Sequence, residues 1–319
     1  MKKTRLCNML GIEYPIIQGG MVWIANGELA AAVSDAGGLG LISPTAGMSR
    51  DGDQVDNLKR QIHIARGLTS KPFGANLPLL HNPQIEGLIA AAIDEGVEVV
   101  VTAAGSPGLY TDRLKEAGIK VLHLVASVRH AQSAEKRGVD GVIAEGCEAG
   151  GHNGMDEIST FALIPQVVDA VGIPVVAAGG IADARGVVAA LALGADGVQM
   201  GTRFVATHEC IAHPKFKEAI IQANDNDTII TGRKLGPIRI LKNELAATIV
   251  EMEGAGASVE ELIAFIGSGR SRTGQLEGDL AKGETYCGSI AGMIEEIKGA
   301  GEVIRSIVDN YETVLDGLR

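Results

Sequence analysis

The sequence predicts an α/β fold: a (β/α)8 TIM barrel with a small, mainly helical insertion after the eighth strand. The first observation is a repeated phrase, in which an amphipathic stretch ends in glycine and a β-branched apolar run follows shortly afterwards. The second is that eight such runs occur before the regularity fails. Glycine adopts the left-handed conformation at a helix end cheaply, so each phrase indicates a helix end, a short loop and a buried parallel strand.

Eight strands are the number that closes a barrel of this kind. We expect them near residues 15–19, 39–43, 72–77, 98–103, 120–125, 141–145, 174–178 and 197–201, with helix-ending glycines at Gly96, Gly118, Gly138, Gly172 and Gly194. Helices fit between the strands, for example at 27–36, 82–95 and 127–137, where Ser127 is placed as an N-cap. A doubly wound sheet is the competing fold, because the repeat does not show that the sheet closes.

The regular alternation stops after the eighth strand. Residues 225–301 indicate short helices and loops, whereas Val303, Ile304, Ile307 and Tyr311 recur at helical spacing and predict a last helix on the barrel. We therefore expect a barrel domain of residues 1–224 and 302–319. The insertion of residues 225–301 would lie over the C-terminal face of the barrel, where active sites of this fold are found.

Composition excludes several classes of function. Of 319 residues, 46% are hydrophobic and 21% charged, which is typical of a globular protein with a substantial core. The net charge of −11 and the 3% of aromatic residues argue against a nucleic-acid surface. No apolar run approaches the roughly 18 residues of a membrane span, so we expect a cytoplasmic protein without a membrane partner. The four cysteines show no CxxC spacing, so we expect neither a metal site nor disulfides.

Two glycine-rich loops follow the last two predicted strands. Ala178, Gly179 and Gly180 end the seventh strand, and Gln199, Gly201 and Thr202 end the eighth. Glycines let main-chain N–H groups approach phosphate oxygens, and these two loops commonly bind phosphate in this fold. The alternative is that the glycines merely end strands. Because neither GxxxxGK[ST] nor an early GxGxxG is present, a mononucleotide is favoured over a dinucleotide.

Two further segments suit a flat ring. Gly19, Gly20 and Met21 follow the first strand, where a ring could lie against the backbone. Asn76 ends the third strand with an amide that both donates and accepts hydrogen bonds. The alternative for Asn76 is a side chain that caps its own loop.

The most reactive stretch follows the sixth strand and runs from Ala144 to Gly154. His152 lies there among glycines, including Gly151, so its imidazole could exchange protons over the mouth of the barrel. The alternative is a loop histidine satisfied by the backbone. Glu145 and Glu148 could bind hydroxyl groups of a ligand or orient loops. The remaining histidines lack such a setting and are expected on helix faces, in loops or, for His123, in the core: His63, His81, His123, His130, His208 and His213.

Six motifs, in order, resemble the flavin-dependent group that contains enoyl-acyl-carrier-protein reductase II and nitronate monooxygenase (2-nitropropane dioxygenase). They are Pro15–Met21, Ala36–Gly40, Lys71–Asn76, Ala144–His152, Ala177–Asp183 and Gln199–Phe204. The resemblance implies non-covalent FMN and places the family's proton-handling histidine at His152. It also implies FMN contacts in the segments described above: Gly19, Gly20, Met21, Asn76, Glu145, Gly151, Ala178, Gly179, Gly180, Gln199, Gly201 and Thr202.

The resemblance favours the enoyl reductase within this group. The expected reaction is NADH- or NADPH-dependent reduction of a trans-2-enoyl thioester carried on acyl carrier protein, with part of the substrate and NAD(P)H site in the insertion. The alternatives are a nitronate monooxygenase, an NADH:quinone reductase and a non-catalytic barrel that binds FMN or phosphate. Basic residues of the insertion could attract a cofactor phosphate or the acidic carrier protein, or be solvated surface charges: Arg233, Lys234, Arg270 and Arg272. A homodimer is a family-level expectation.

Overall fold

The computed structural model describes residues 1–80 and 82–318 of the chain, so His81 lies outside the described residues. Its larger sheet has eight strands in the order β1-β9-β8-β6-β5-β4-β3-β2. All neighbouring pairs along this order are parallel. The strands are β1 (Ile16–Gln18), β2 (Gly40–Ile42), β3 (Phe73–Pro78), β4 (Val99–Ala103), β5 (Lys120–Val125), β6 (Gly141–Glu145), β8 (Val175–Ala178) and β9 (Gly197–Met200).

The two ends of this sheet join, which closes the barrel. The main-chain N–H of Gln18 donates to Leu39 O, and the N–H of Leu39 donates to Ile16 O, both at 2.9 Å. Ile17 and Leu39 form a parallel bridge at the same place. A doubly wound sheet has two free edges, so the prediction of a (β/α)8 barrel is confirmed and the competing fold is wrong.

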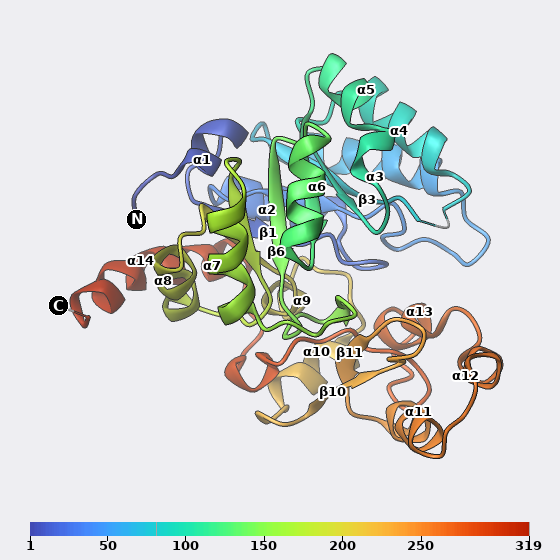
Figure 1. Cartoon of the computed structure of the whole chain (residues 1–319). Coiled ribbons are helices and arrows are strands. Elements are labelled where there is room, and N and C mark those ends of the chain that lie inside the picture. The colour runs from blue at the N-terminus through green and yellow to red at the C-terminus, as the bar shows by residue number, and fades with distance from the viewer. Residues whose placement is uncertain (81, 319) are drawn as a thin grey trace.

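Helices surround the barrel, as Figure 1 shows. They are α2 (Gly27–Asp35), α3 (Gln54–Leu68), α4 (Ile85–Asp94), α5 (Thr111–Glu116) after the short η1 (Pro107–Leu109), α6 (Val128–Lys136), α7 (Thr160–Ala170), α8 (Ala184–Ala192) and α14 (Ala300–Asp316). Ser127 caps α6, since its hydroxyl accepts a hydrogen bond from the His130 N–H at 3.2 Å. The last helix, α14, contacts α8 and α2 and so completes the ring of helices.

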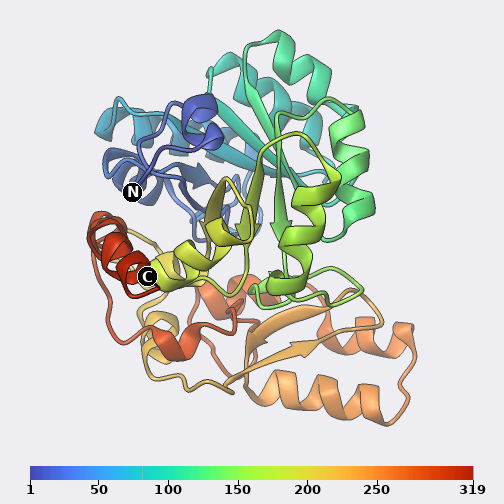
Figure 2. The same cartoon turned by 60° about the vertical axis from the view of Figure 1, so that its left-hand side comes forward.

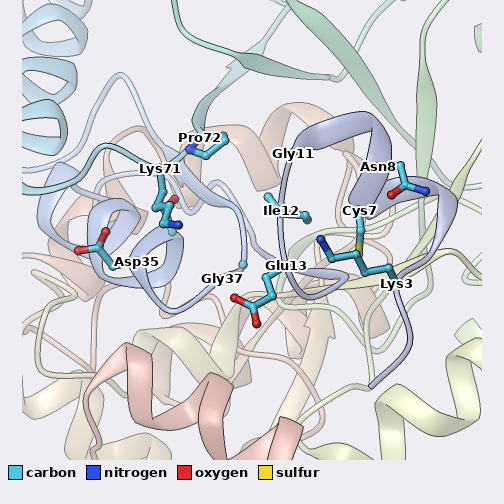
Figure 3. Close-up of a pocket in the computed structure, with 12 residues that line it drawn as sticks. Lys3, Cys7, Asn8, Gly11, Ile12, Glu13, Asp35, Gly37, Lys71 and Pro72 are labelled. Atoms are coloured by element: carbon cyan, nitrogen blue, oxygen red, sulfur yellow. The ribbon is translucent and has the colours of Figure 1, made fainter.

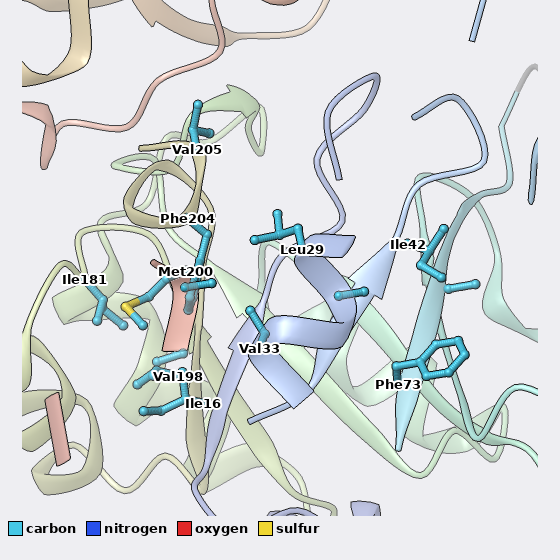
Figure 4. Close-up of a cluster of buried hydrophobic side chains, with 14 of the residues drawn as sticks. Ile16, Leu29, Val33, Ile42, Phe73, Ile181, Val198, Met200, Phe204 and Val205 are labelled. Atoms are coloured by element: carbon cyan, nitrogen blue, oxygen red, sulfur yellow. The ribbon is translucent and has the colours of Figure 1, made fainter. Parts of the chain in front are cut away.

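Apolar side chains fill both faces of the barrel wall. Outward-facing residues such as Ile16, Val198 and Met200 pack against the surrounding helices (Figure 4). Inward-facing residues such as Val101 and Ile143 form a second cluster inside the barrel. The short helix α1 (Arg5–Leu10) adds Leu6, Cys7 and Leu10 to that inner cluster and therefore closes the N-terminal end of the barrel.

The helix-ending glycines behave as predicted with one exception. Gly96, Gly118, Gly138 and Gly194 have φ between 61° and 95°, the left-handed conformation that the repeat requires. Gly172 is not among the residues with positive φ. Helix α7 ends instead at Ala170, the backbone of Val171 is extended, and the Gly172 N–H donates to a Glu135 carboxylate oxygen at 2.7 Å. The prediction that Gly172 adopts the left-handed conformation is therefore wrong. In a left-handed turn its N–H would bond to a carbonyl of the preceding helix, but here the Glu135 side chain of α6 accepts that hydrogen bond.

The chain after β9 contains more β structure than its sequence indicates. It forms α9 (Thr202–Val205), α10 (Pro214–Ile221), β10 (Thr228–Thr231), β11 (Ile238–Leu241), α11 (Glu244–Gly254), α12 (Val259–Ile266), α13 (Arg270–Gln275) and η2 (Ala291–Met293). Strands β10 and β11 pair with each other, and β11 also pairs with the two-residue strand β7 (Gly151–His152). Four-residue strands are too short to show a reliable period, so the sequence did not reveal them.

Figure 2 shows that residues 225–290 lie beyond the ends of the barrel strands, as a separate layer. The boundaries proposed for this segment, 225 and 301, stay a prediction. Within the described residues, no helix is long and apolar enough to cross a membrane.

Candidate active site

A cavity of about 1060 Å³ opens at the carboxyl end of the barrel strands. Such a volume accommodates a cofactor-sized ligand. Every residue that the sequence assigned to the site lines this cavity: His152, Gly19, Gly20, Met21, Asn76, Glu145, Gly151, Ala178, Gly179, Gly180, Gln199, Gly201 and Thr202. The structure thus brings together residues from five strand ends, while their binding roles stay predictions.

The two glycine-rich loops present unused hydrogen-bond donors to the cavity. Within the described chain, the main-chain N–H groups of Gly180 and Gly201 donate to no protein acceptor. The Thr202 hydroxyl, which also lines the cavity, accepts from the Gly288 N–H at 2.8 Å. The first turn of α8 does not help, because the Asp183 carboxylate already accepts from the N–H groups of Arg185 and Gly186. Anion binding here therefore depends on the loops rather than on that helix.

At two of these positions, the neighbouring atoms leave no room for a Cβ, so glycine is required. Gly179 has φ 91°, and a Cβ there would lie 2.9 Å from Gly146 O. A Cβ on Gly20 would overlap the Asn76 side chain. Asn76 donates through Nδ2 to Gly20 O at 3.4 Å, so it bridges β3 to the loop after β1 and does not cap its own loop. The backbone is therefore free to approach a ligand closely on both sides of the cavity.

Two polar side chains form part of the cavity floor. Gln199 is only 8% exposed, and its Oε1 has no hydrogen-bond partner among the described residues. The carboxyl group of Glu145 lies beside the same cavity, and burial raises its pKa to about 8. A buried acceptor without a donor costs free energy, so the floor is suited to a ligand with N–H or O–H groups.

His152 reaches the cavity from the short strand β7. Its register partner is Ile238 on β11, and the Asn153 N–H donates to Pro237 O at 2.8 Å. The ring makes an edge contact with Tyr286, with ring centroids 5.7 Å apart and an interplanar angle of 81°. The protein atoms around the imidazole lower its pKa by desolvation, which favours the neutral form, while the residue stays exposed toward the cavity. The loop histidine is therefore not satisfied by the backbone, and it can take up a proton.

Glu148 orients the loop that carries His152. Its carboxylate accepts from the Thr160 N–H at 2.9 Å and from the Thr160 hydroxyl at 2.9 Å. It thus caps α7, whose own N-cap residue Ser159 makes no such bond. Of the two roles considered for Glu148, the structure shows the orientation of loops.

The other charged and titratable candidates are engaged elsewhere. Each of the four basic residues of the insertion binds a protein acceptor: Arg233 binds Glu157, Lys234 binds Ala257 O, Arg270 binds Ile266 O, and Arg272 binds Glu277. His123 is buried, as expected for a core residue, and its Nδ1 lies 2.7 Å from the Thr102 hydroxyl. Burial lowers its pKa to about 4. Among the described residues, no group of three or more His, Cys, Asp or Glu side chains could hold a metal ion.

A second cavity of about 470 Å³ lies at the opposite end of the barrel, between α1 and the turn after α2. Figure 3 shows Glu13 and Asp35 there, together with Lys3 and Lys71. Active sites of this fold lie at the other end of the strands, and the mixed charges favour no particular ligand. We therefore assign the site to the larger cavity.

The sequence interpretation missed some residues that line the larger cavity. Tyr286, Leu235 and Gln275 reach it from the insertion, and His123 and His130 reach it from β5 and α6. Tyr286 follows an irregular stretch with no repeat or motif, so only the contact with His152 identifies it. The nearby Gly288 also lines the cavity.

A closed (β/α)8 barrel with unused amides, an unpartnered amide oxygen and a neutral imidazole around one cavity has the features of a nucleotide-cofactor enzyme. A family model described as nitronate monooxygenase matches residues 3–310. The chain belongs to this family, and it is a flavin-dependent oxidoreductase.

Solved structures cover the whole fold. The structure of FabK from Thermotoga maritima is 43% identical, with a TM-score of 0.91, and the match covers 100% of this chain and 99% of that one. A nitroalkane oxidase from Streptomyces ansochromogenes is 28% identical, with a TM-score of 0.83, over 98% of this chain and 99% of that one.

The curated relatives of this chain are named for different activities. A probable nitronate monooxygenase of Staphylococcus aureus is 36% identical over 79% of this chain and 82% of its own length. A Mycobacterium tuberculosis protein is 32% identical over 96% of this chain and 95% of its own length, and its name describes it as a dehydrogenase of a hydroxy-methyl-oxo-octahydroindene carboxyl-CoA. Relatives of this chain therefore differ in substrate, and the family by itself does not choose among them.

Proposed function

We propose that the chain is an FMN-dependent enoyl-acyl-carrier-protein reductase that uses NADH or NADPH. The observation that carries the proposal is the match along the full length of both chains to FabK, which is enoyl-acyl-carrier-protein reductase II. This match includes the insertion that contributes Tyr286 and Gly288 to the cavity. The same proposal includes three further points: the enzyme is cytoplasmic, its substrate is carried on acyl carrier protein, and it forms a homodimer.

The cavity residues fit FMN. The N–H groups of Gly180 and Gly201 would bind its phosphate, together with the Thr202 hydroxyl. The unpartnered Oε1 of Gln199 would accept from a donor of the cofactor, and Glu145 would bind a ribityl hydroxyl. Gly19, Gly20, Met21 and Asn76, at the carboxyl ends of β1 and β3, would flank the flavin ring. When bound, FMN supplies the group that accepts hydride from the nicotinamide and passes it to the β-carbon of the enoyl thioester.

His152 would handle the proton of the reaction. Hydride addition at the β-carbon places negative charge on the thioester, and the α-carbon then needs a proton. Negative charge beside the imidazole favours its protonated form, so binding and reaction would offset the burial that lowers its pKa in the free cavity. His152 would then deliver the proton directly or through a water molecule.

Nitronate oxidation is the second candidate, and one observation favours it. Desolvation lowers the pKa of the His152 imidazole where it lines the cavity, which favours its neutral form. A neutral imidazole is ready to act as a base on the carbon acid of a nitroalkane. The likeness to the nitroalkane oxidase and to the probable nitronate monooxygenase is consistent with this use.

Anaerobic stopped-flow mixing distinguishes the candidates. We expect NADH or NADPH to bleach the flavin absorbance rapidly, and a crotonyl thioester to restore it. The His152→Ala variant should bind FMN normally and lose turnover by about a hundredfold or more. No bleaching by either nicotinamide, together with turnover of propyl nitronate in air, would reject the reductase. Reoxidation by a quinone but by no thioester would assign the chain to the quinone reductases.

A further inference from the structure

The aromatic ring of Tyr286 is placed beside His152 by the pairing of the insertion sheet. His152 pairs with Ile238 on β11, and Tyr286 forms an antiparallel bridge with Ile240 of the same strand. Residues two apart on a strand share a face, so their register partners also lie on one face, next to each other. This arrangement accounts for the edge contact between the two rings, with centroids 5.7 Å apart.

Little else fixes the His152 ring. Within the described chain, no hydrogen bond to either ring nitrogen is formed, and burial alone lowers the pKa of the imidazole. The charged groups on neighbouring elements are directed elsewhere: Arg239 of β11 donates to Cys147 O, and Glu148 accepts from Thr160. Edge-to-face contacts between aromatic rings have a preferred geometry, so the contact with Tyr286 restricts the orientation of the imidazole.

Tyr286 is itself held firmly. Its hydroxyl donates to Oε2 of Glu284 at 3.3 Å, and Glu284 is 6% exposed. Ser271 lies beside the same hydroxyl and accepts from Trp23 Nε1 at 3.0 Å. Gly151 has φ 87°, and a Cβ there would lie 3.3 Å from the Tyr286 ring, so the backbone before His152 passes close to it. The ring is therefore fixed from both the insertion and the loop after β1.

We propose that Tyr286 is the positioning residue for His152, and that the insertion controls the proton step through this ring contact. This inference rests on the proposed function in one respect, the role of His152 as the proton-handling group. It goes beyond that function because it gives the insertion, and one residue in it, a defined part in the chemistry. The tyrosine hydroxyl acts only to fix its own ring.

The first test needs no substitution. In the purified full chain with FMN added, nuclear Overhauser contacts should join the ring protons of His152 and Tyr286. The His152 signals are assigned by their loss in the His152→Gln variant. If these contacts are absent in the folded protein, the proposal is wrong, whatever the activities are.

Substitutions of Tyr286 then test the consequence. Tyr286→Phe keeps the ring and should retain turnover within about twofold, whereas Tyr286→Leu and Tyr286→Met remove it and should lower kcat about tenfold with little change in KM. In the last two variants, the imidazole pKa, followed by NMR with and without FMN, should rise toward 6.5, because the ring of Tyr286 no longer covers one side of the imidazole. An unchanged imidazole pKa and unchanged kcat in a folded Leu or Met variant would overturn the proposal, as would equal loss in Tyr286→Phe.

The two proposals fail in distinguishable ways. If His152→Ala keeps full turnover while Tyr286→Leu still shifts the imidazole pKa, the role of His152 is wrong and the positioning contact stands. If His152→Ala abolishes turnover and Tyr286→Leu changes neither the imidazole pKa nor kcat, the proposed function stands and the positioning role is wrong.

Discussion

Glu145 has an unusual environment for a carboxyl group. It ends β6 at the floor of the cavity, and burial raises its pKa from 4.5 to about 8. Within the described chain, no hydrogen bond to its carboxyl group from a protein donor offsets the loss of water. The ionised form is therefore disfavoured in the folded protein, and folding is linked to the uptake of a proton.

This linkage predicts a pH dependence of stability in the FMN-free chain. A raised folded pKa means that the unfolded chain loses its proton first, near 4.5, and the folded chain only near 8. The contribution of this group to the free energy of unfolding is therefore greatest below pH 4.5 and is lost as the pH rises to about 8. At about pH 8, Glu145→Gln should therefore have a higher urea midpoint than the parent, with a free energy of unfolding larger by on the order of a few kcal/mol. At about pH 4, the two proteins should have similar urea midpoints.

The control for this measurement is Glu116→Gln, a change at an exposed position of α5. It should leave the urea midpoint unchanged at both pH values. An advantage of Glu145→Gln that is equal at both pH values would contradict the titration and indicate a packing effect.

The conformation and close surroundings of Gly179 lead to a prediction about FMN affinity. In Gly179→Ala, a Cβ would lie 2.9 Å from Gly146 O and 3.0 Å from the Thr160 hydroxyl, so the loop must shift. We expect FMN affinity, measured by quenching of flavin fluorescence, to fall about tenfold or more. Gly118→Ala is matched, because Gly118 also has positive φ, at 82°, but nothing lies within 4 Å of its Cβ position. It should cost about 1 kcal/mol of stability and leave FMN binding intact. Equal affinities of the two variants would exclude the phosphate loop from FMN binding.

At the scale of elements, the two-residue strand β7 depends on its neighbour β11. So short a strand has few hydrogen bonds of its own, and its position is set by pairing with Ile238 and Arg239. Arg239 adds a side-chain bond, since its Nε donates to Cys147 O at 2.8 Å and its guanidinium also donates to the Thr228 hydroxyl at 3.1 Å. One arginine thus ties both strands of the insertion to the loop that carries His152.

Removal of this link should affect catalysis more than folding. In Arg239→Met, the Cys147 carbonyl loses a charged donor, and we expect kcat to fall about tenfold while the thermal midpoint changes by only a few degrees. Steady-state kinetics and a thermal melt measure the two effects. Lys242→Met, an exposed substitution just beyond β11, is the matched control and should change neither. Full activity in Arg239→Met would show that β7 is positioned without the side chain.

At the scale of the whole molecule, the two ends of the barrel are closed by different means. Helix α1 closes the N-terminal end with Leu6 and Leu10, which are buried among the inward-facing strand residues. The C-terminal end is left open as the cavity and is covered in part by the insertion, which supplies Leu235 and Tyr286. The chain thus has apolar packing inside one end of the barrel and polar, glycine-rich loops around the larger cavity at the other end.

Most of the barrel could be predicted from the sequence. Each strand near Gly96, Gly118, Gly138 and Gly194 follows a glycine in the left-handed conformation, which is a local requirement and is therefore visible locally. The site residues could be predicted for a related reason. The ends of parallel strands meet at one face of a barrel, so motifs at successive strand ends converge whatever the details of packing. Even so, the roles of these residues toward FMN stay predictions.

Other features depend on contacts between segments far apart in the chain. Three of them require a partner that the local sequence does not specify. They are the closure of the sheet between Gln18 and Leu39, the packing of α1 inside the barrel, and the hydrogen bond from Gly172, after α7, to Glu135. The strands β7, β10 and β11 are too short for their period to be recognised. Tyr286 reaches His152 only because β11 pairs with both segments.

The sequence by itself therefore determined the repeating helix and strand units, the two glycine-rich loops and the position of His152 after a strand end, because propensity and spacing act over a few residues. The tertiary structure alone decided that the sheet closes, that the surroundings of one carboxyl group beside the cavity raise its pKa, and that a tyrosine from the insertion lies against the histidine. These outcomes depend on burial and on strand register, which are properties of the assembled chain.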